Sequence, residues 1–420
     1  MKKLLLLIVS LLLLVSCGNS GSSSGSSGPV EVVIWHTLTE HHVENLQAII
    51  DDFNAAHEGE IVVVAQAQPL ENFDAKVIQA VRNGEGPDII FSYPSLASEF
   101  VLDDLLVNLT PYIEDPDTGI PDFYDELTSG VVAEVSQWDG NIYLIPIIKT
   151  GEILFYNKTL FDELGLSEPK TWSDLEAAAK VISEHTGKPA FGFDSLTDGA
   201  TAMIIQSGAT YLDADTKTVG FNSAAAAAAL QKYADGVQAG YFRLVGEDQY
   251  FSNPFGSEAV AMYIGSSAGV DFVLSAVDGK FEVGYAPLPQ EGPVKYANSW
   301  GTSAIIFKSD AATEAAAFQF VKYFTSTEVN AKWAIGYGAI TPYKSAQELD
   351  SFKEYVEAKP VIGVLVESLK NVGYVPSLPG STEVRNELGK AAEQACGGLM
   401  DAQTALDQAK EAADSALSQY

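Results

Sequence analysis

Residues 139–166 of this chain read DGNIYLIPIIKTGEILFYNKTLFDELGL. Two apolar runs rich in β-branched residues, 142–148 and 153–156, flank a short polar bend, and a helical pattern that ends at Gly165 follows them. This order predicts a strand that leaves one lobe and a strand that enters another. We therefore expect the chain to cross first between two lobes near 146–151, with a ligand cleft at the crossing.

The chain before this stretch alternates between strand patterns and helix patterns. Runs rich in strand-forming residues at 30–35, 61–65 and 88–93 are separated by amphipathic helical patterns at 43–57 and 73–83. Such alternation predicts an α/β fold with mixed, mainly parallel sheets flanked by helices. In such sheets the carboxyl ends of the strands open toward a ligand.

The length and composition suit two lobes with a hinge between them. The 420 residues with 47% hydrophobic content supply enough material for two cores. We place a second crossing before an apolar run at 300–307 and a third crossing near Trp333. The expected first lobe is 30–148 plus 292–331, and the expected second lobe is 149–291 plus 332–420.

The N-terminus has the pattern of an export signal. Two lysines precede an apolar run at 4–15, which is shorter than the roughly 20 residues that a membrane span needs. The sequence LVSC at 14–17 resembles a bacterial lipobox, in which the chain is cut before a lipid-modified cysteine. We therefore expect residues 1–16 to be a lipoprotein signal peptide and Cys17 to be the lipidation site.

A Gly/Ser run follows Cys17 at 18–28. We expect 17–29 to be a flexible tether with a reach of roughly 20 Å, which would hold an exported body at the membrane through its lipid alone. The alternative is an ordinary signal peptide with an incidental cysteine. The pattern leaves open whether the envelope has one membrane or two.

The charge balance excludes several kinds of partner. The net charge is −32, and loss of the two leader lysines would bring it to −34, which opposes nucleic acids and anionic membrane surfaces. Only Arg82, Arg243 and Arg385 supply guanidinium groups. The other cysteine is Cys396, so lipidation of Cys17 would leave no intrachain disulfide and no cysteine metal site.

Five short motifs span nearly the whole chain after the leader, and they are IWH at 34–36, GPDII at 86–90, LFYNK at 154–158 with LF at 160–161, PKTWSDL at 169–175 and GYGAITP at 336–342. In this order they resemble family 1 of the bacterial extracellular solute-binding proteins of ABC importers. That family includes maltose-binding and glycerol-phosphate-binding branches. The resemblance implies a two-lobed periplasmic-binding-protein fold of type II that closes on a solute and then docks on a membrane permease.

Carried over position by position, the resemblance also implies a set of ligand contacts. They are Trp35, His36, Glu71, Tyr93, Thr150, Phe193, Asp194, Ser266, Ser267, Trp300, Gly301 and Tyr337. Aromatic faces suit the C–H faces of a sugar, and carboxylates and hydroxyls bond its hydroxyl groups. We therefore expect a monomeric receptor for a neutral carbohydrate or polyol that needs no cofactor and no metal.

The sequence departs from the glycerol-phosphate branch at positions that bear on the solute. That branch implies an aromatic residue before Glu71 and a carboxylate after Tyr93, where this chain has Leu70 and Pro94. It also implies an arginine within 374–379, where none is present. Arg385 lies nearby and could replace it, so a glycerol 3-phosphate or glycerophosphodiester receptor stays the alternative.

Two other classes of site compete with the receptor. His36, His41 and His42 could suggest a metal site, but they lack a cysteine or a carboxylate cage. A surface lipoprotein glycosidase would need two carboxylates about 5 to 10 Å apart, and 56 acidic residues could hide such a pair. Motifs for a serine nucleophile, a zinc protease or a P-loop are absent from the sequence, so we expect a binding protein and not an enzyme.

Overall fold

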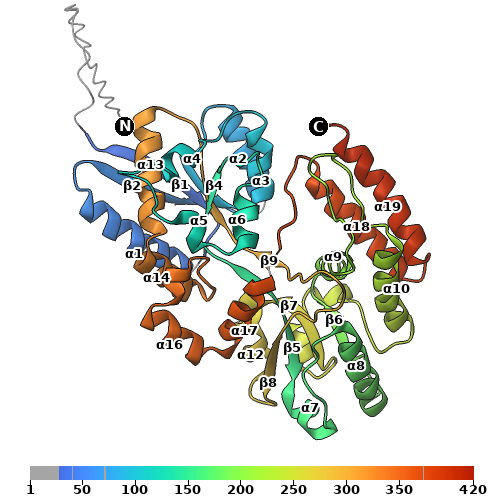
Figure 1. The fold of residues 1–420 in the computed structure, drawn as a ribbon. Helices are drawn as coiled ribbons and strands as arrows, with labels where there is room; N and C mark the ends of the chain where they lie inside the picture. The colour runs from blue at the N-terminus through green and yellow to red at the C-terminus, as the bar shows by residue number, and fades with distance from the viewer. Residues whose placement is uncertain (1–27, 40, 71, 372) are drawn as a thin grey trace, which may run out of the picture.

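The computed structural model describes residues 28–39, 41–70, 72–371 and 373–420. They form two α/β lobes, each with its own sheet and helices, joined by several crossing segments (Figure 1). The expected signal peptide, the expected lipidation site Cys17 and most of the expected tether lie outside the described residues. No helix within the described part of the chain is long and apolar enough to cross a bilayer.

The sheet of lobe one has five strands. Their order is β2 (Ile61–Ala67), β1 (Val30–His36), β3 (Ile89–Ser92), β10 (Ser303–Ile306) and β4 (Leu144–Pro146). Strand β1 is parallel to β2 and β3, whereas β10 is antiparallel to both of its neighbours, β3 and β4. Four strands therefore share one direction, and the reversed strand is the one that returns from lobe two.

Amphipathic helices cover this sheet. Helix α1 (His41–Ala56) buries Leu46, Ile49, Ile50 and Phe53 at spacings of three and four residues, as the sequence pattern predicts. The other helices of lobe one are α2 (Phe73–Arg82), α3 (Pro94–Val101), α4 (Thr110–Ile113), α5 (Phe123–Glu126), α6 (Ser129–Val135), α13 (Ala311–Phe324), α14 (Thr327–Tyr337) and α15 (Lys344–Gln347).

The sheet of lobe two follows the same rule. Its order is β6 (Phe191–Phe193), β7 (Met262–Ser266), β5 (Thr150–Asn157) and β8 (Val283–Pro287), and β9 (Ser299–Trp300) pairs with the start of β5. Strand β6 is parallel to β7, and β5 is antiparallel to both β7 and β8. The reversed strand is again the one that enters from the other lobe, so both sheets are mixed, as predicted. The expected predominance of parallel pairing is not found, because every pair that involves β10 or β5 is antiparallel.

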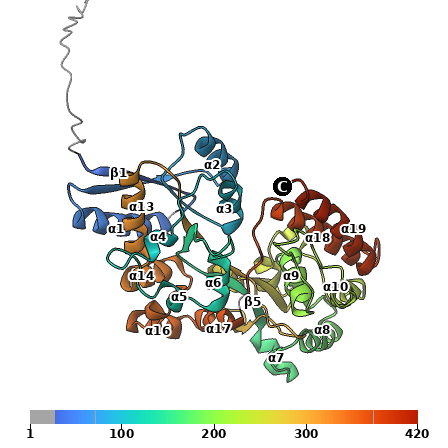
Figure 2. The same cartoon turned by 45° about the horizontal axis from the view of Figure 1, so that its top comes forward.

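Helices pack on both faces of the second sheet. They are α7 (Lys158–Leu164), α8 (Trp172–Thr186), α9 (Leu196–Gln206), α10 (Ala224–Gln238), α11 (Ser252–Gly256), α12 (Val270–Val277), α16 (Asp350–Ala358), α17 (Pro360–Ser368), α18 (Ser381–Cys396) and α19 (Ala402–Leu417). Both views place α18 and α19 against α9 and α10, so the C-terminal helices dock on lobe two (Figures 1 and 2). Short 3₁₀ turns lie at Gly246–Asp248, Ser267–Gly269 and Leu369–Asn371.

The first two crossings lie beside each other. The chain leaves lobe one after β4, and the backbone N–H of Ile147 donates to the Thr302 carbonyl at 3.1 Å, where the chain returns toward β10. Thr150 at the start of β5 pairs with Trp300 of β9 in antiparallel register. The outgoing and returning segments are therefore hydrogen-bonded to each other, and this pairing forms the base of the hinge.

The third crossing falls later than the expected position near Trp333. That side chain is only 1% exposed and packs in the core of lobe one against the ring of Phe324, with centroids 5.2 Å apart. Helix α15 still contacts lobe one, because the Lys344 ammonium donates to the Asp125 carbonyl at 2.6 Å. Phe352 of α16 instead joins the core that covers β5 and β7.

The lobe boundaries follow from these contacts. Tyr296 packs in the core of lobe two, although 292–331 was expected in lobe one, and Trp333 packs in lobe one, although 332–420 was expected in lobe two. The difference arises because the buried side chains of Tyr296 and Trp333 place their segments in lobe two and lobe one, although each residue lies close in the chain to a crossing. We propose that lobe one comprises 30–148 and 302–348, and that lobe two comprises 149–301 and 349–420.

Candidate ligand cleft

A cavity of about 370 Å³ lies between the lobes at the crossings. Lobe one contributes Tyr93 and Glu134, and lobe two contributes Asp198 and Arg385. The crossing segment adds Trp300 and Gly301, and further aromatic walls come from Tyr211, Tyr296 and Tyr374. This volume falls in the range of small-molecule sites, and its walls combine ring faces with hydroxyls and charged groups.

A second cavity of about 490 Å³ lies against lobe one. His36, Phe73 and Asp74 line it together with Tyr337. Tyr93 belongs to the walls of both cavities. It stands at the N-terminus of α3, directly after β3, so the two cavities meet at the carboxyl end of a central strand, where an α/β sheet presents its ligands.

His36 is held as a neutral ring at the tip of β1. Its Nδ1 accepts the backbone N–H of Leu38 at 3.1 Å, so the proton of the neutral ring lies on Nε2. Burial lowers the pKa of His36 below its ordinary value of 6.5. The ring therefore offers a donor without a positive charge to the lobe-one cavity at neutral pH.

The floor of the interlobe cavity contains a paired charge. The guanidinium of Arg385 on α18 donates to both carboxylate oxygens of Asp198 on α9, with Nη2 3.0 Å from Oδ2. The side chain of Asp198 is 9% exposed. The same guanidinium lies over the ring of Trp300, with its carbon 5.4 Å from the ring centroid, so one arginine holds both a buried carboxylate and an aromatic wall.

Glu152 lies close to this pair and is almost fully buried. Its carboxylate accepts from the Asn298 side chain, which also donates to the Asp198 carbonyl at 2.9 Å. Burial and the neighbouring negative charge of Asp198 raise the pKa of Glu152 to about 8. Because Glu152 stands on β5 and Asn298 stands beside β9, this contact joins the outgoing and returning strands in addition to their backbone pairing.

Lys149, at the first crossing, is also part of an ion pair. Lys149 is 1% exposed, and its ammonium donates to Glu134 on α6 of lobe one. Its backbone N–H donates to the Ile340 carbonyl at 2.9 Å. A Cβ added at Gly301 would overlap the carbonyl oxygen of Ile148, so the returning strand needs a glycine to approach the outgoing one this closely.

Five of the twelve expected contacts line the two cavities. They are His36, Tyr93, Trp300, Gly301 and Tyr337. Tyr337 stacks on the ring of His42, with centroids 4.2 Å apart, and this contact fixes its orientation. Glu71 lies outside the described residues. That these five residues contact a ligand remains a prediction.

Trp35 occupies the opposite face of the sheet from His36. Neighbouring residues of a strand point to opposite faces, and β1 buries Val32, Ile34 and His36 on one of them. The indole N–H of Trp35 donates to Gln66 at 3.0 Å, and the Lys76 ammonium lies 5.0 Å from its ring centroid. Trp35 is therefore not among the described residues that line these two cavities.

Phe193 and Asp194 pack within lobe two. Phe193 is 2% exposed and contacts the rings of Phe191 and Tyr233, so it presents no surface to the cleft in this conformation. Asp194 accepts the backbone N–H of Phe251 at 2.6 Å, and burial raises its pKa to about 6. These placements differ from the expected ligand contacts because the strand end at β6 is covered by the segment that leads into α11.

Thr150, Ser266 and Ser267 bond to nearby chain. The Thr150 hydroxyl donates to the Trp300 carbonyl at 3.3 Å. Ser266 caps the turn that follows β7 by accepting the Ala268 N–H at 3.3 Å, and the buried Ser267 hydroxyl accepts the Gly151 N–H at 3.4 Å. All three hydroxyls thus stabilise the crossing or the strand end, and none is among the described residues lining the two cavities.

The structure adds residues that the expected set lacked. Glu134, Asp198, Tyr211, Tyr296, Tyr374 and Arg385 all line the interlobe cavity. Local patterns pointed only to Arg385, as a nearby guanidinium, and to Asp198, because the polar stretch FDSLTD at 193–198 is typical of a loop at a cleft. The other four lie in helices or loops without a distinctive local pattern, so their positions depend on how the lobes face each other.

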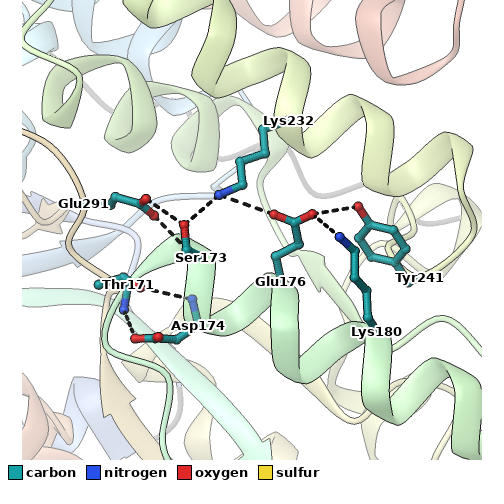
Figure 3. Close-up of polar contacts among 8 residues, drawn as sticks. All are labelled: Thr171, Ser173, Asp174, Glu176, Lys180, Lys232, Tyr241 and Glu291. Carbon is teal, nitrogen blue, oxygen red and sulfur yellow. Dashed lines mark hydrogen bonds and ion pairs between the residues drawn. The ribbon is translucent and has the colours of Figure 1, made fainter.

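A third cavity of about 380 Å³ lies within lobe two, between α8 and α10. Its walls are mainly apolar, and a polar network closes its rim (Figure 3). The Lys232 ammonium lies 2.9 Å from the Ser173 hydroxyl and 3.3 Å from Glu176, while Glu291 accepts from Ser173. These groups satisfy one another and join two helices to a loop, so the rim is a packing contact of lobe two.

A two-lobed α/β fold with an aromatic and polar cavity at its crossings defines a solute-binding protein of the type II periplasmic class. The chain belongs to the bacterial extracellular solute-binding protein family, whose family model matches residues 39–331. The members of this family are binding proteins that act outside the cytoplasm.

Relatives and solved structures agree with this assignment. The chain is 27% identical over 414 residues to the sn-glycerol-3-phosphate-binding periplasmic protein of Brucella abortus, covering 92% of this chain and 93% of that one. The cyclic α-maltosyl-1,6-maltose binding protein of Arthrobacter globiformis matches with a TM-score of 0.82 and 25% identity, over 94% of this chain and 100% of that one. The sugar-binding protein MalE of Xanthomonas citri has a TM-score of 0.81 and 23% identity, over 93% and 98%.

Proposed function

We propose that this protein captures a neutral carbohydrate or polyol outside the cytoplasm and delivers it to the permease of an ABC importer. The observation behind this proposal is the interlobe cavity, where Trp300, Tyr93 and Tyr211 surround carboxylate and guanidinium groups. Ring faces cover the C–H faces of a sugar, and the polar groups bond its hydroxyls. A wrong solute would leave buried polar groups unpaired, and this penalty supports selection among sugars.

Closure of the lobes is the proposed mechanism. The cavity walls come from both lobes, and the segments between the lobes are paired through a few backbone hydrogen bonds at 147–151 and 299–302. A solute that contacts both walls binds the closed form more tightly than the open one and shifts the population toward it. A permease that recognises the closed form would then receive only the loaded receptor.

The second candidate solute is glycerol 3-phosphate or a glycerophosphodiester. The similarity to the sn-glycerol-3-phosphate-binding protein of Brucella abortus favours this candidate. The similarity to a cyclic maltosyl-maltose binding protein favours a sugar. Both candidates are small hydroxylated solutes, and they differ in whether the site must accommodate a phosphate.

Attachment at the membrane completes the proposal. The lipobox-like LVSC and the Gly/Ser run that follows it support a lipid on Cys17 with the receptor domain on a flexible tether. The protein would act as a monomer, without cofactor, metal or catalytic turnover. Metabolic labelling with a radioactive fatty acid tests the anchor, since Cys17→Ala should abolish the label.

A binding screen tests the solute class. We expect thermal unfolding of the chain from residue 29 onward to shift upward with at least one mono- or oligosaccharide or polyol. A solute at 100 times its dissociation constant adds about 2.7 kcal/mol to the free energy of unfolding. Small-angle scattering with the same solute should show a smaller radius of gyration. A shape that does not respond to any sugar, polyol or phosphodiester would contradict the proposal.

A further inference from the structure

The charge of the interlobe cavity is balanced within the protein. Arg385 supplies the only fixed positive charge among the described residues that line this cavity and its neighbour against lobe one. Glu134, Asp198 and Asp74 supply negative charges to the same two cavities. Lys149, just beneath, is already bonded to Glu134. The walls therefore carry no unpaired cation.

The geometry of the ion pair between Arg385 and Asp198 determines which N–H groups of the guanidinium remain free to bind a ligand. Asp198 accepts from Nη1 and Nη2, which leaves the second N–H of each and the Nε N–H. These donors can bond hydroxyl oxygens. A phosphate could still reach the side-on edge of the guanidinium, formed by the Nε N–H and one free Nη N–H. The negative charge of the Asp198 carboxylate, which is bonded to the same guanidinium, would oppose a second anion there.

Asp198 is held in position from its own side. It lies in the first turn of α9, where its backbone N–H donates to the Ser195 hydroxyl at 3.3 Å, and its carbonyl accepts from the Asn298 side chain at 2.9 Å. The helix N-terminus favours a negative charge at this position. The carboxylate therefore stays in place without help from a ligand, and the pair is preorganised.

We infer that Asp198 is a specificity-determining residue that neutralises Arg385, so that the cleft accepts uncharged polyhydroxylated solutes and rejects phosphorylated ones. This inference rests on the proposed solute-binding function and names the class of solute. Arg385 donates hydrogen bonds to hydroxyl groups and packs against the ring of Trp300. The negative charge of Asp198 cancels the positive charge of Arg385, so the arginine does not attract anions.

The test is phosphate binding by the Asp198→Asn variant. We expect isothermal titration of wild-type protein with sn-glycerol 3-phosphate to show no binding at millimolar concentration. Asp198→Asn should bind it at least about tenfold more tightly than wild type, because the freed guanidinium can make charge-assisted bonds. This gained affinity should fall as salt is added, since it depends on charge.

A matched control separates this effect from the loss of one negative charge. Arg243 forms a comparable pair with Asp248 outside the cleft, and Asp248→Asn frees an arginine at that remote position. We expect Asp248→Asn to gain no phosphate binding. An equal gain in both variants would overturn the inference, and so would a folded Asp198→Asn protein that binds no more phosphate than wild type.

A second variant decides the question if Asp198→Asn does not fold. Binding of sn-glycerol 3-phosphate by wild type that disappears in Arg385→Gln would overturn the inference directly. Absence of phosphate binding in both, with weaker binding of a neutral sugar in Arg385→Gln, would support it. Failure of every neutral solute to bind wild type would instead contradict the proposed function, whatever the phosphate titrations show.

Discussion

Lys149 and Ile340 exchange both of their backbone hydrogen bonds, at 2.9 and 3.0 Å, although they lie in different crossing regions of the chain. The first crossing is thereby tied to the segment that follows α14. Asn330 of α14 adds a side-chain bond to the Ile147 carbonyl at 3.0 Å. The hinge therefore consists of several crossing segments that are hydrogen-bonded to one another. When one lobe rotates relative to the other, the backbone of all these segments must change together.

The ion pair at this hinge gives a stability prediction. Glu134→Gln leaves the Lys149 charge buried without its partner, and we expect the free energy of unfolding in urea to fall by roughly 3 kcal/mol. Lys149→Met should cost less, because Glu134 is partly accessible to water. As a control, Asp52→Asn removes the exposed pair with Lys332 and should cost under about 0.5 kcal/mol. Equal losses in Glu134→Gln and Asp52→Asn would contradict the prediction.

Gly301 gives a prediction on backbone packing. We expect Gly301→Ala to lower the free energy of unfolding by about 1 to 3 kcal/mol, because its methyl group would overlap the Ile148 carbonyl and force the crossing strands apart. Gly363→Ala is the matched control, since the nearest atom to its added methyl is Val356 Cγ1 at 3.5 Å. Because Gly363 lies inside α17, alanine there should be neutral or stabilising. The melting temperatures of both variants check this pair.

The sequence analysis expects both Trp35 and Trp300 to contact the ligand, but of these two only Trp300 lines one of the two described cavities. Trp300 is 36% exposed and lines the interlobe cavity, whereas Trp35 bonds to Gln66 on the other side of β1 from His36. For a sugar found in the screen, we expect Trp300→Ala to lose on the order of 2 kcal/mol of binding free energy, roughly thirtyfold in affinity. Trp35→Ala should lose much less. A larger loss of sugar affinity in Trp35→Ala than in Trp300→Ala, measured by calorimetry, would show that Trp35 contacts the ligand and would contradict the prediction.

Glu152 predicts a pH dependence of stability. Its folded pKa of about 8 lies above the ordinary value of 4.5, so the unfolded chain ionises this carboxyl first as pH rises. Glu152 therefore contributes stability that is fully present below about pH 4.5 and is lost as the pH rises toward 8. Glu152→Gln stays neutral, so its stability relative to wild type should grow by up to about 1.4 kcal/mol per pH unit over that window.

Asp194→Asn is the comparison for this window. The folded pKa of Asp194 is about 6, against an ordinary value of 3.8, so the stability gained by removing its charge should stop growing near pH 6. Urea unfolding of the two variants from pH 4 to pH 9 measures both profiles. A Glu152→Gln profile that stays parallel to wild type above pH 6 would show that Glu152 is not the buried acid responsible.

Much of the fold could be predicted from local patterns in the chain. The pattern of apolar residues in α1 and the strand runs of β1, β2 and β3 repeat at the helical or extended period, and the structure confirms each element. Residues 171–174 also predict the start of a helix, with Ser173 as its expected cap. The structure confirms the helix start but not the cap, because α8 begins with a capping box in which Thr171 and Asp174 bond each other's backbone N–H (Figure 3). Periodicity and capping need only neighbouring residues, so they can be recognised without a partner segment.

The candidate site was only partly predictable, because adjacent residues diverge in space. His36 lines a cavity while Trp35 faces the other side of the sheet, and a strand's alternation does not say which face the cleft will occupy. Phe193 was also expected to contact the ligand, but its side chain packs in the core of lobe two. A resemblance identifies the strand tip that approaches a ligand, but the packing of the neighbouring helices decides which side chain reaches it.

Local patterns in the chain predict the α/β alternation and a strand at 153–156 that enters lobe two, and five short motifs indicate the family of extracellular solute-binding proteins. Tertiary structure alone decided that Asp198 and Arg385, which are 187 residues apart, form one neutral pair at the floor of the cleft. The reason is physical: hydrophobic periodicity fixes each helix and strand from its own residues. The meeting of two charges from α9 and α18 depends instead on how those helices pack against each other.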